Sequence, residues 1–223
     1  MSTKKGDFIE LVFTGKANGQ IFDSNILEDM KKIDSEAKPR QLKIIIGQGM
    51  VVKGLDKYLE EKEINTPYTV NVGAQDGFGA RSSNLVKTIP LHVFTSQKIN
   101  PEPGMTLALD NMFVHIRAVS GARVIADFNN PLAGKDLEYT FTIVRKIEEV
   151  EEKTRVFFEW FLRTIPEFEI SDKVTVKGPA NLEPIINFFK QKFSDLIGKE
   201  LSFSVQPQAE KIQEEGKAQQ QSL

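Results

Sequence analysis

The 223 residues include 29 Lys and Arg against 31 Asp and Glu, and 40% of them are hydrophobic. This composition is typical of a globular protein, and at roughly 150 residues per domain the length allows one large domain or two to three small ones. The net charge of −2 gives no broad basic field, so nucleic acid is not expected as a partner. The lack of cysteine excludes disulfides, thiol nucleophiles and thiolate metal sites.

The apolar runs of the chain argue against export and membrane insertion. The stretch after the basic start is broken by Glu10 and has no small-residue cleavage site. No run approaches the roughly 18 consecutive apolar residues of a membrane span. We therefore expect a cytoplasmic protein without a membrane partner.

The first elements in chain order are those of a β-hairpin. Apolar residues alternate with polar ones between residues 7 and 14, at Ile9, Leu11 and Phe13. Asn18-Gly19 then supplies the positive-φ pair that a two-residue turn needs, and residues 20–24 are expected to return as the partner strand. The polar stretch 28–40 has little periodicity and is expected to be a loop.

A short helix and three more strands are expected after this loop. Helical spacing places three apolar residues on one face, Val51, Leu55 and Leu59. The strands are expected at residues 42–46, 69–72 and 137–147.

The stretch between the last two of these strands is too long to be a plain loop. It contains four apolar segments that fit short strands, at residues 85–89, 106–109, 113–119 and 123–128. Residues 85–128 are therefore expected to form an inserted, small β-rich domain. A domain of this size cannot bury all its apolar residues, so some of its Met and Phe side chains are expected on the surface.

The C-terminal part predicts two helices and a strand. An apolar face that includes Phe157, Phe158 and Phe161 marks a helix within residues 149–164, which Pro166 ends. Asn181 is the expected N-cap of a second helix that Gly198 terminates. Leu201, Phe203 and Val205 alternate as a strand. These elements form a module over residues 151–205, and residues 206–223 are expected to be a disordered tail.

Four segments, in this order, resemble the FKBP family of peptidyl-prolyl cis/trans isomerases. They are Ile21-Phe22-Asp23-Ser24, the sequence GQGMVVKGL at residues 47–55, Val72-Gly73 with Phe78-Gly79, and Asn130-Pro131-Leu132-Ala133-Gly134. The interruption between the last two resembles the long bacterial and archaeal type, in which a domain is inserted in the flap. The resemblance implies an α+β fold: an FKBP-like antiparallel sheet wrapped on a short helix (residues 1–84 and 129–150), the insert (85–128) and the C-terminal module (151–205).

The resemblance also implies a set of site residues. Three residues would take part in catalysis: Asp23, Phe78 and Tyr139. The others would bind substrate: Phe13, Phe22, Leu42, Val51, Val52 and Leu55, with Leu132 and Ala133 at the rim. The residues also allow other roles: Asp23 fits an N-cap or turn, Phe78 a loop anchor and Tyr139 a strand core position.

Three of these residues depart from the usual family pattern. Phe13 and Phe78 stand where tyrosines are common, so two hydroxyls are missing, and Leu55 replaces a tryptophan often found at the pocket floor. The two missing hydroxyls predict reduced turnover, whereas Leu55 is expected to widen or soften the floor without abolishing binding. These departures keep open an alternative function, a folding chaperone whose prolyl pocket binds with little or no isomerase turnover. A third hypothesis is a scaffold with a vestigial pocket, in which the C-terminal domain mediates assembly.

The chemistry of prolyl isomerisation fits the rest of the sequence. Rotation about an X-Pro bond is resisted by amide resonance, so an apolar cup with a few oriented polar groups is sufficient and no nucleophile or cofactor is expected. The only histidines, His92 and His115, make a poor metal site. Expected partners are unfolded or partly folded polypeptides that contain proline, and the wide aromatic face at residues 157–161 predicts a homodimer through the C-terminal domain.

Overall fold

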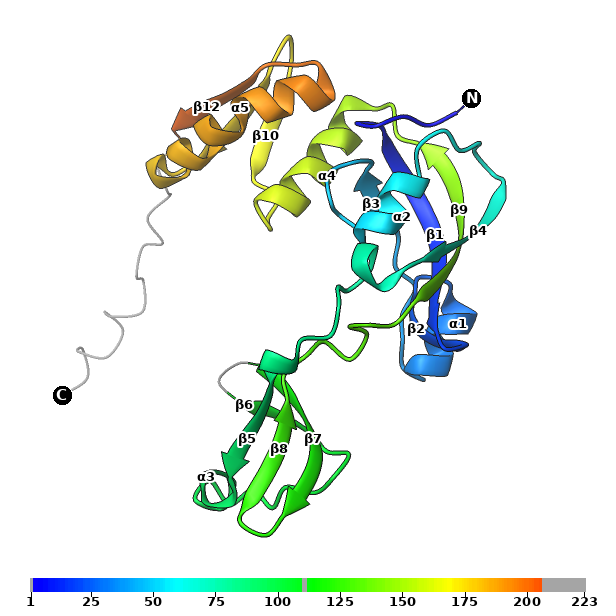
Figure 1. Ribbon diagram of the computed structural model, residues 1–223. Helices are drawn as coiled ribbons and strands as arrows, with labels where there is room; N and C mark the ends of the chain where they lie inside the picture. Colours follow the sequence, from blue (N-terminus) through cyan, green and yellow to red (C-terminus); the bar gives the residue numbers. More distant parts are fainter. Residues whose placement is uncertain (1, 110–111, 206–223) are drawn as a thin grey trace, which may run out of the picture. The chain divides into compact units, whose positions relative to one another are not determined.

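The computed structural model describes residues 2–109 and 112–205 (Figure 1). The tail expected at residues 206–223 lies outside the described residues. The chain divides into two units. One comprises the segment up to Lys5 with Ile9–Lys146, and the other Gly6–Phe8 with the chain from Ile147 onward. None of the described helices is long and apolar enough to cross a membrane.

A five-stranded sheet forms the core of the first unit (Figure 1). Its strands are β1 (Phe8–Ala17), β2 (Gln20–Ser24), β3 (Leu42–Ile45), β4 (Pro67–Val72) and β9 (Leu137–Lys146). They run in the order β2-β1-β9-β4, and β3 also pairs with β1. Asn18 (φ 51°) and Gly19 (φ 76°) make the expected turn between β1 and β2. The α+β fold with antiparallel strands is confirmed.

The short helix α2 (Lys53–Tyr58) packs against this sheet. Leu55 on this helix and Leu59 at its C-cap are fully buried, as expected. Val51, which was expected on the same helical face, lies before the helix begins. The helix approaches β4 closely because Gly54 has no side chain: a Cβ there would lie 2.3 Å from Val72 Cγ1. Gly54 therefore allows the helix–sheet contact on which the floor of the site depends.

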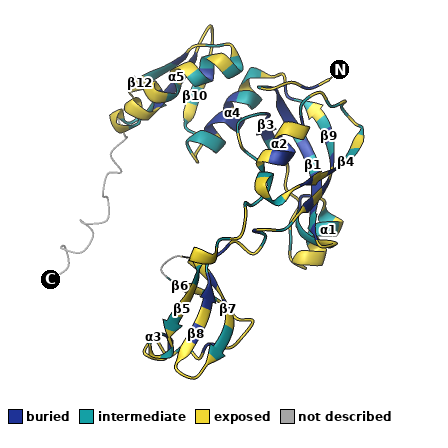
Figure 2. Ribbon diagram, in the orientation of Figure 1, coloured by how far each residue is buried: buried dark blue, intermediate teal, exposed yellow. Residues whose placement is uncertain are grey.

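The stretch expected to be a loop contains a helix instead, α1 (Leu27–Ile33). None of its residues is buried (Figure 2). The segment therefore has no apolar periodicity from which a helix could be predicted. Its anchor is polar, because the Thr14 hydroxyl donates to the Asp29 carboxylate at 2.6 Å. Two 3-10 turns, η1 (Ala74–Asp76) and η2 (Ser83–Leu85), follow β4.

The inserted segment forms its own antiparallel sheet in the order β5-β8-β7-β6. The strands are β5 (Val86–Pro90), β6 (Thr106–Leu109), β7 (Met112–Ser120) and β8 (Arg123–Asp127). The helix α3 (Leu91–Thr95), which sequence reasoning missed, contributes Phe94 to a core whose other fully buried members are Val114, Ile116, Val124 and Ala126. The four strands were expected, whereas a five-residue helix is too short to show a period.

Two backbone segments join the insert to the first sheet, and hydrogen bonds of the Asn129 side chain connect them. The Asn129 side chain accepts from Ser82 N at 2.8 Å and donates to Ser82 O at 3.0 Å. Asn129 also donates to the buried carboxylate of Asp127, which forms an ion pair with Arg81. The insert is therefore held at both of its ends.

The second unit combines two helices with a three-stranded sheet. Its elements are α4 (Val150–Phe161), β10 (Glu167–Ile170), β11 (Val174–Gly178), η3 (Ala180–Leu182), α5 (Glu183–Ile197) and β12 (Leu201–Val205). β10 and β11 were missed: they have only four and five residues, and two of the four in β10 are glutamates. The N-cap expected at Asn181 was wrong, since η3 carries the chain into α5 and Leu182 occupies that position. Gly198 ends the helix with φ 79°, as expected.

The aromatic face of α4 packs against other elements of the second unit. Phe157 and Phe158 are fully buried, and their rings contact Phe189 and Phe193 of α5 and Phe168 of β10. Trp160 is half-buried under the Arg163 guanidinium. The width of the face is therefore explained by packing within one chain.

Candidate active site

A cavity of about 430 Å³ opens over the first sheet beside α2. Eleven residues line it: Phe13, Phe22, Asp23, Arg40, Leu42, Met50, Val51, Val52, Leu55, Phe78 and Tyr139. Nine of them are site residues inferred from sequence. The fold thus brings together side chains that lie up to 126 positions apart, from Phe13 to Tyr139.

The strand register explains how β2 delivers two consecutive residues to this cavity. Asp23 pairs with Gly15, but the next pair is Ile21 with Lys16, so a bulge leaves Phe22 without a partner. A bulge turns the side chain of the extra residue away from strict alternation. Phe22 and Asp23 can therefore both line the cavity.

Gly15 lies at the centre of a row across three strands. It pairs with Asp23 on β2 and with Tyr139 on β9. A Cβ on Gly15 would lie 2.7 Å from the Phe22 ring and 2.9 Å from the Tyr139 ring. Both rings thus occupy the space that a side chain at position 15 would fill.

Three aromatic contacts fix the walls. The Phe22 ring forms T-shaped pairs with Phe78 (centroids 5.9 Å apart) and Tyr139 (5.8 Å), both near a right angle. Phe13 lies 6.2 Å from Tyr139 in a tilted arrangement. Edge-to-face pairs of this kind hold rings in one orientation, so the cup is shaped before any ligand enters.

The charged residues lie at the open side of the cavity. Arg40 Nη2 contacts Asp23 Oδ1 at 2.6 Å and Ser24 O at 3.4 Å. Both side chains of this ion pair are about half exposed. Sequence reasoning missed Arg40 because it lies 17 residues from Asp23, in the stretch assigned to a loop.

A buried carboxylate shapes the floor. Asp56 accepts hydrogen bonds from Gly47 N (2.8 Å) and Gly49 N (2.9 Å), which fixes the turn before Val51 and Val52. Met50, also missed, accepts from Ile45 N through its sulfur at 3.0 Å. Leu55 closes the floor and is 1% exposed.

Tyr139 is the one tyrosine of this cavity. Its burial, and after that the negative charge of Asp23, raises the pKa of its hydroxyl well above the ordinary value. Within residues 2–109 and 112–205, no hydrogen bond to this hydroxyl is formed. The hydroxyl is therefore a protonated donor at neutral pH.

Leu132 and Ala133 do not line this cavity. Leu132 packs against the core of the sheet, and Ala133 is buried in a turn closed by its own N–H to Asn130 O. Their assignment to the rim stays a prediction.

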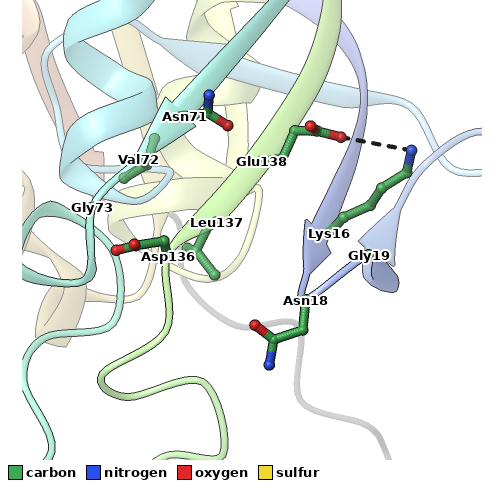
Figure 3. Close-up of a pocket in the computed structure, with 9 residues that line it drawn as sticks. All are labelled: Lys16, Asn18, Gly19, Asn71, Val72, Gly73, Asp136, Leu137 and Glu138. Atoms are coloured by element: carbon green, nitrogen blue, oxygen red, sulfur yellow. Dashed lines mark ion pairs between the residues drawn. The ribbon is translucent and has the colours of Figure 1, made fainter.

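A second hollow, of about 500 Å³, lies at the ends of β4 and β9 (Figure 3). Polar residues dominate it, including Lys16 and Glu138, whose charged groups are 3.7 Å apart. It lacks the aromatic walls that suit a prolyl ring. Among the described residues, no group of three or more His, Asp and Glu could hold a metal ion.

Comparison with known proteins agrees with this geometry. The family model of FKBP-type peptidyl-prolyl cis-trans isomerase matches residues 1–93, and the model of the FKBP26 IF domain matches residues 87–132. A short-type peptidyl-prolyl cis-trans isomerase from Methanocaldococcus jannaschii is 28% identical over 151 residues, which are 66% of this chain and 96% of that protein.

Two relatives carry the name FKBP-type peptidyl-prolyl cis-trans isomerase SlyD. The protein from Haemophilus influenzae is 33% identical over 52% of this chain and 63% of its own length. The protein from Escherichia coli K12 is 31% identical over 56% of this chain and 66% of its own length. The match thus spans just under two thirds of these SlyD proteins. The family model over residues 1–93, these relatives and the observed fold together show that the chain carries an FKBP-type peptidyl-prolyl cis-trans isomerase domain.

Proposed function

We propose that this protein catalyses cis–trans isomerisation of X-Pro bonds in folding polypeptides. The observation that carries the proposal is the preformed aromatic cup with one ion pair, Asp23 with Arg40, at its open side. An apolar cup excludes the water that would hydrogen-bond the planar imide. Fixed polar groups can then favour the twisted, less delocalised bond.

The test is a refolding assay in which one X-Pro bond limits the rate. The wild-type chain is expected to accelerate refolding, and Asp23→Ala is expected to lower kcat/KM by about tenfold, the range of one charged interaction. Glu138→Ala is the matched control, because this carboxylate lies in the hollow of Figure 3. Equal rates for the two variants would remove Asp23 from the site.

A second candidate function is a binding module with little turnover. The absence of hydroxyls at Phe13 and Phe78 favours it, because both side chains line the cup. A proline peptide titrated by NMR would then shift signals around the cup while refolding remained at the uncatalysed rate. Acceleration above that rate would exclude this candidate.

The insert is proposed to bind unfolded client. Strand alternation turns Val114, Ile116 and Val124 towards the core and places Phe113 and Ile125 on the other face of the sheet. Phe113 is 77% exposed, and Met112, Met105 and Ile125 are also exposed. Flexible methionines and an exposed aromatic ring suit binding to many apolar segments.

Suppression of client aggregation tests this proposal. Phe113→Ser is expected to weaken suppression, whereas Phe188→Ser on α5 is a matched control, because Phe188 is 79% exposed in the other unit. Equal loss in both variants would show that general surface apolarity acts, and no loss in Phe113→Ser would remove this face from client binding.

Dimerisation through the C-terminal unit is also a proposal. Packing of α4 accounts for the aromatic face, but Ile185 and Phe188 remain exposed on α5. Light scattering on the full chain is expected to give twice the chain mass for the wild type and the single mass for Ile185→Ser/Phe188→Ser. A monomeric wild type would refute the dimer. Cytoplasmic location stays a prediction.

A further inference from the structure

The cavity holds few hydrogen-bonding side chains. Three of its eleven lining residues carry oxygen or nitrogen in the side chain: Asp23, Arg40 and Tyr139. Asp23 and Arg40 pair with each other at 2.6 Å. The Tyr139 hydroxyl remains, and within the described residues nothing pairs with it.

The position of Tyr139 is fixed with little freedom. The residue is 4% exposed, and its ring is held by the edge of Phe22 and the tilted ring of Phe13. It fills the space left by Gly15, where a Cβ would lie 2.9 Å from Tyr139 Cε1. The hydroxyl lines the open cavity and has no partner among the described residues. A ligand that displaces water from the cavity must supply an acceptor for it, because a desolvated hydroxyl without a partner costs free energy.

Building on the isomerase function proposed above, we propose that the Tyr139 hydroxyl donates a hydrogen bond to the backbone of the bound prolyl segment. It supplies from β9 the hydroxyl that Phe13 on β1 and Phe78 lack. Burial and the charge of Asp23 keep the pKa of this group high, so it acts as a donor throughout the neutral range.

Amide chemistry identifies the acceptor. In the planar imide, resonance places negative charge on the carbonyl oxygen, and this charge falls as the bond twists. A donor to that oxygen would stabilise the planar state and slow rotation. The acceptor is therefore a carbonyl flanking the rotating bond, and the hydrogen bond holds the segment equally in the planar and twisted states.

This assignment predicts a particular kinetic pattern. An interaction that is equal in the ground and transition states changes KM and leaves kcat unaltered. Tyr139→Phe removes only the hydroxyl and keeps the ring that packs on Phe22. On a short proline peptide we expect KM to rise about three- to tenfold, the range of one neutral hydrogen bond, with kcat and Tm unchanged.

The matched control removes a hydroxyl elsewhere. Tyr68 accepts from Glu63 N at 3.0 Å outside the cavity, and Tyr68→Phe is expected to leave both constants unaltered. Rescue provides a second readout. In the double variant Phe13→Tyr/Tyr139→Phe, the hydroxyl is carried by the neighbouring ring on β1. This double variant is expected to recover part of the affinity that Tyr139→Phe loses.

Three outcomes would overturn the assignment: unaltered KM in Tyr139→Phe, a fall in kcat alone, or a loss of activity that follows a fall in Tm and is not rescued. Failure of the isomerase function gives a different result, because the wild type would not accelerate refolding. Peptide titration by NMR then replaces kinetics. A three- to tenfold weaker affinity of Tyr139→Phe would still support Tyr139 as the donor, and equal affinity would refute it.

Discussion

The two antiparallel sheets of the first unit differ in what covers them. The five-stranded sheet lies against α2 and forms an aromatic cup with fixed walls. The four-stranded sheet of the insert buries one face around Phe94 and leaves Phe113 exposed on the other. The same kind of element thus forms one pocket with aromatic walls and one open face with exposed apolar side chains. This difference predicts that chemistry and client capture can be separated by mutation.

The largest expected effect comes from removing the insert. Residues 84–128 are replaced by a short Gly-containing flap, with Ser82 and Asn129 kept as the closing pair. Activity on proline peptides should persist, because every lining residue lies outside this segment. Activity on an unfolded protein should fall by about a hundredfold, since tethering raises the effective concentration of the client. Refolding and peptide assays on one preparation measure both, and equal losses would contradict a separate role for the insert.

The next effect concerns the shape of the cup. Gly15→Ala places a methyl group against the rings of Phe22 and Tyr139, and we expect at least a tenfold fall in kcat/KM with about 1–3 kcal/mol lost from the unfolding free energy. Gly73→Ala is the control, because its φ is −63° and the nearest atom to its Cβ is 3.9 Å away. Chemical denaturation and peptide kinetics test both. A normal rate for Gly15→Ala would show that the rings can move apart.

A gain of function is expected at Phe78. Phe78→Tyr adds a hydroxyl to a residue that lines the cup and contacts Phe22. We expect kcat/KM to rise by up to about tenfold, which corresponds to about 1.4 kcal/mol of barrier. An unchanged rate in the peptide assay would mean that Phe78 contributes through apolar shielding alone.

The smallest effect is on stability at alkaline pH. Burial and Asp23 raise the folded-state pKa of Tyr139 above its unfolded value. The folded state therefore retains the proton while the unfolded state loses it, and stability falls as pH rises above about 10. Denaturation curves between about pH 9 and pH 11 should show a larger loss for the wild type than for Tyr139→Phe. Equal losses of stability in the wild type and in Tyr139→Phe would mean that the hydroxyl is solvated by water in the folded state as it is in the unfolded state.

Sequence reasoning was accurate where apolar periodicity was strong. The hairpin, α2 and the insert strands were inferred from sequence patterns, and nine of the eleven residues that line the cavity were inferred from the family resemblance. Arg40 could not be found in this way, because its ion pair with Asp23 depends on the path of an exposed helix, α1, without an apolar stripe. The prediction of an N-cap at Asn181 was wrong for a related reason, because a 3-10 turn before a helix has no distinctive sequence pattern.

Gly6–Phe8 belong to the second unit, although the residues on either side of this segment belong to the first. Phe8 is 1% exposed, its carbonyl accepts from Ile147 N at 2.8 Å, and the Lys153 ammonium lies 5.8 Å from its ring. During synthesis, at about 5–20 residues per second, on the order of ten seconds separates Phe8 from Ile147. The second unit therefore cannot be completed from its own continuous segment alone. The Phe8 side chain therefore cannot reach its buried position until Ile147 and Lys153 have been synthesised.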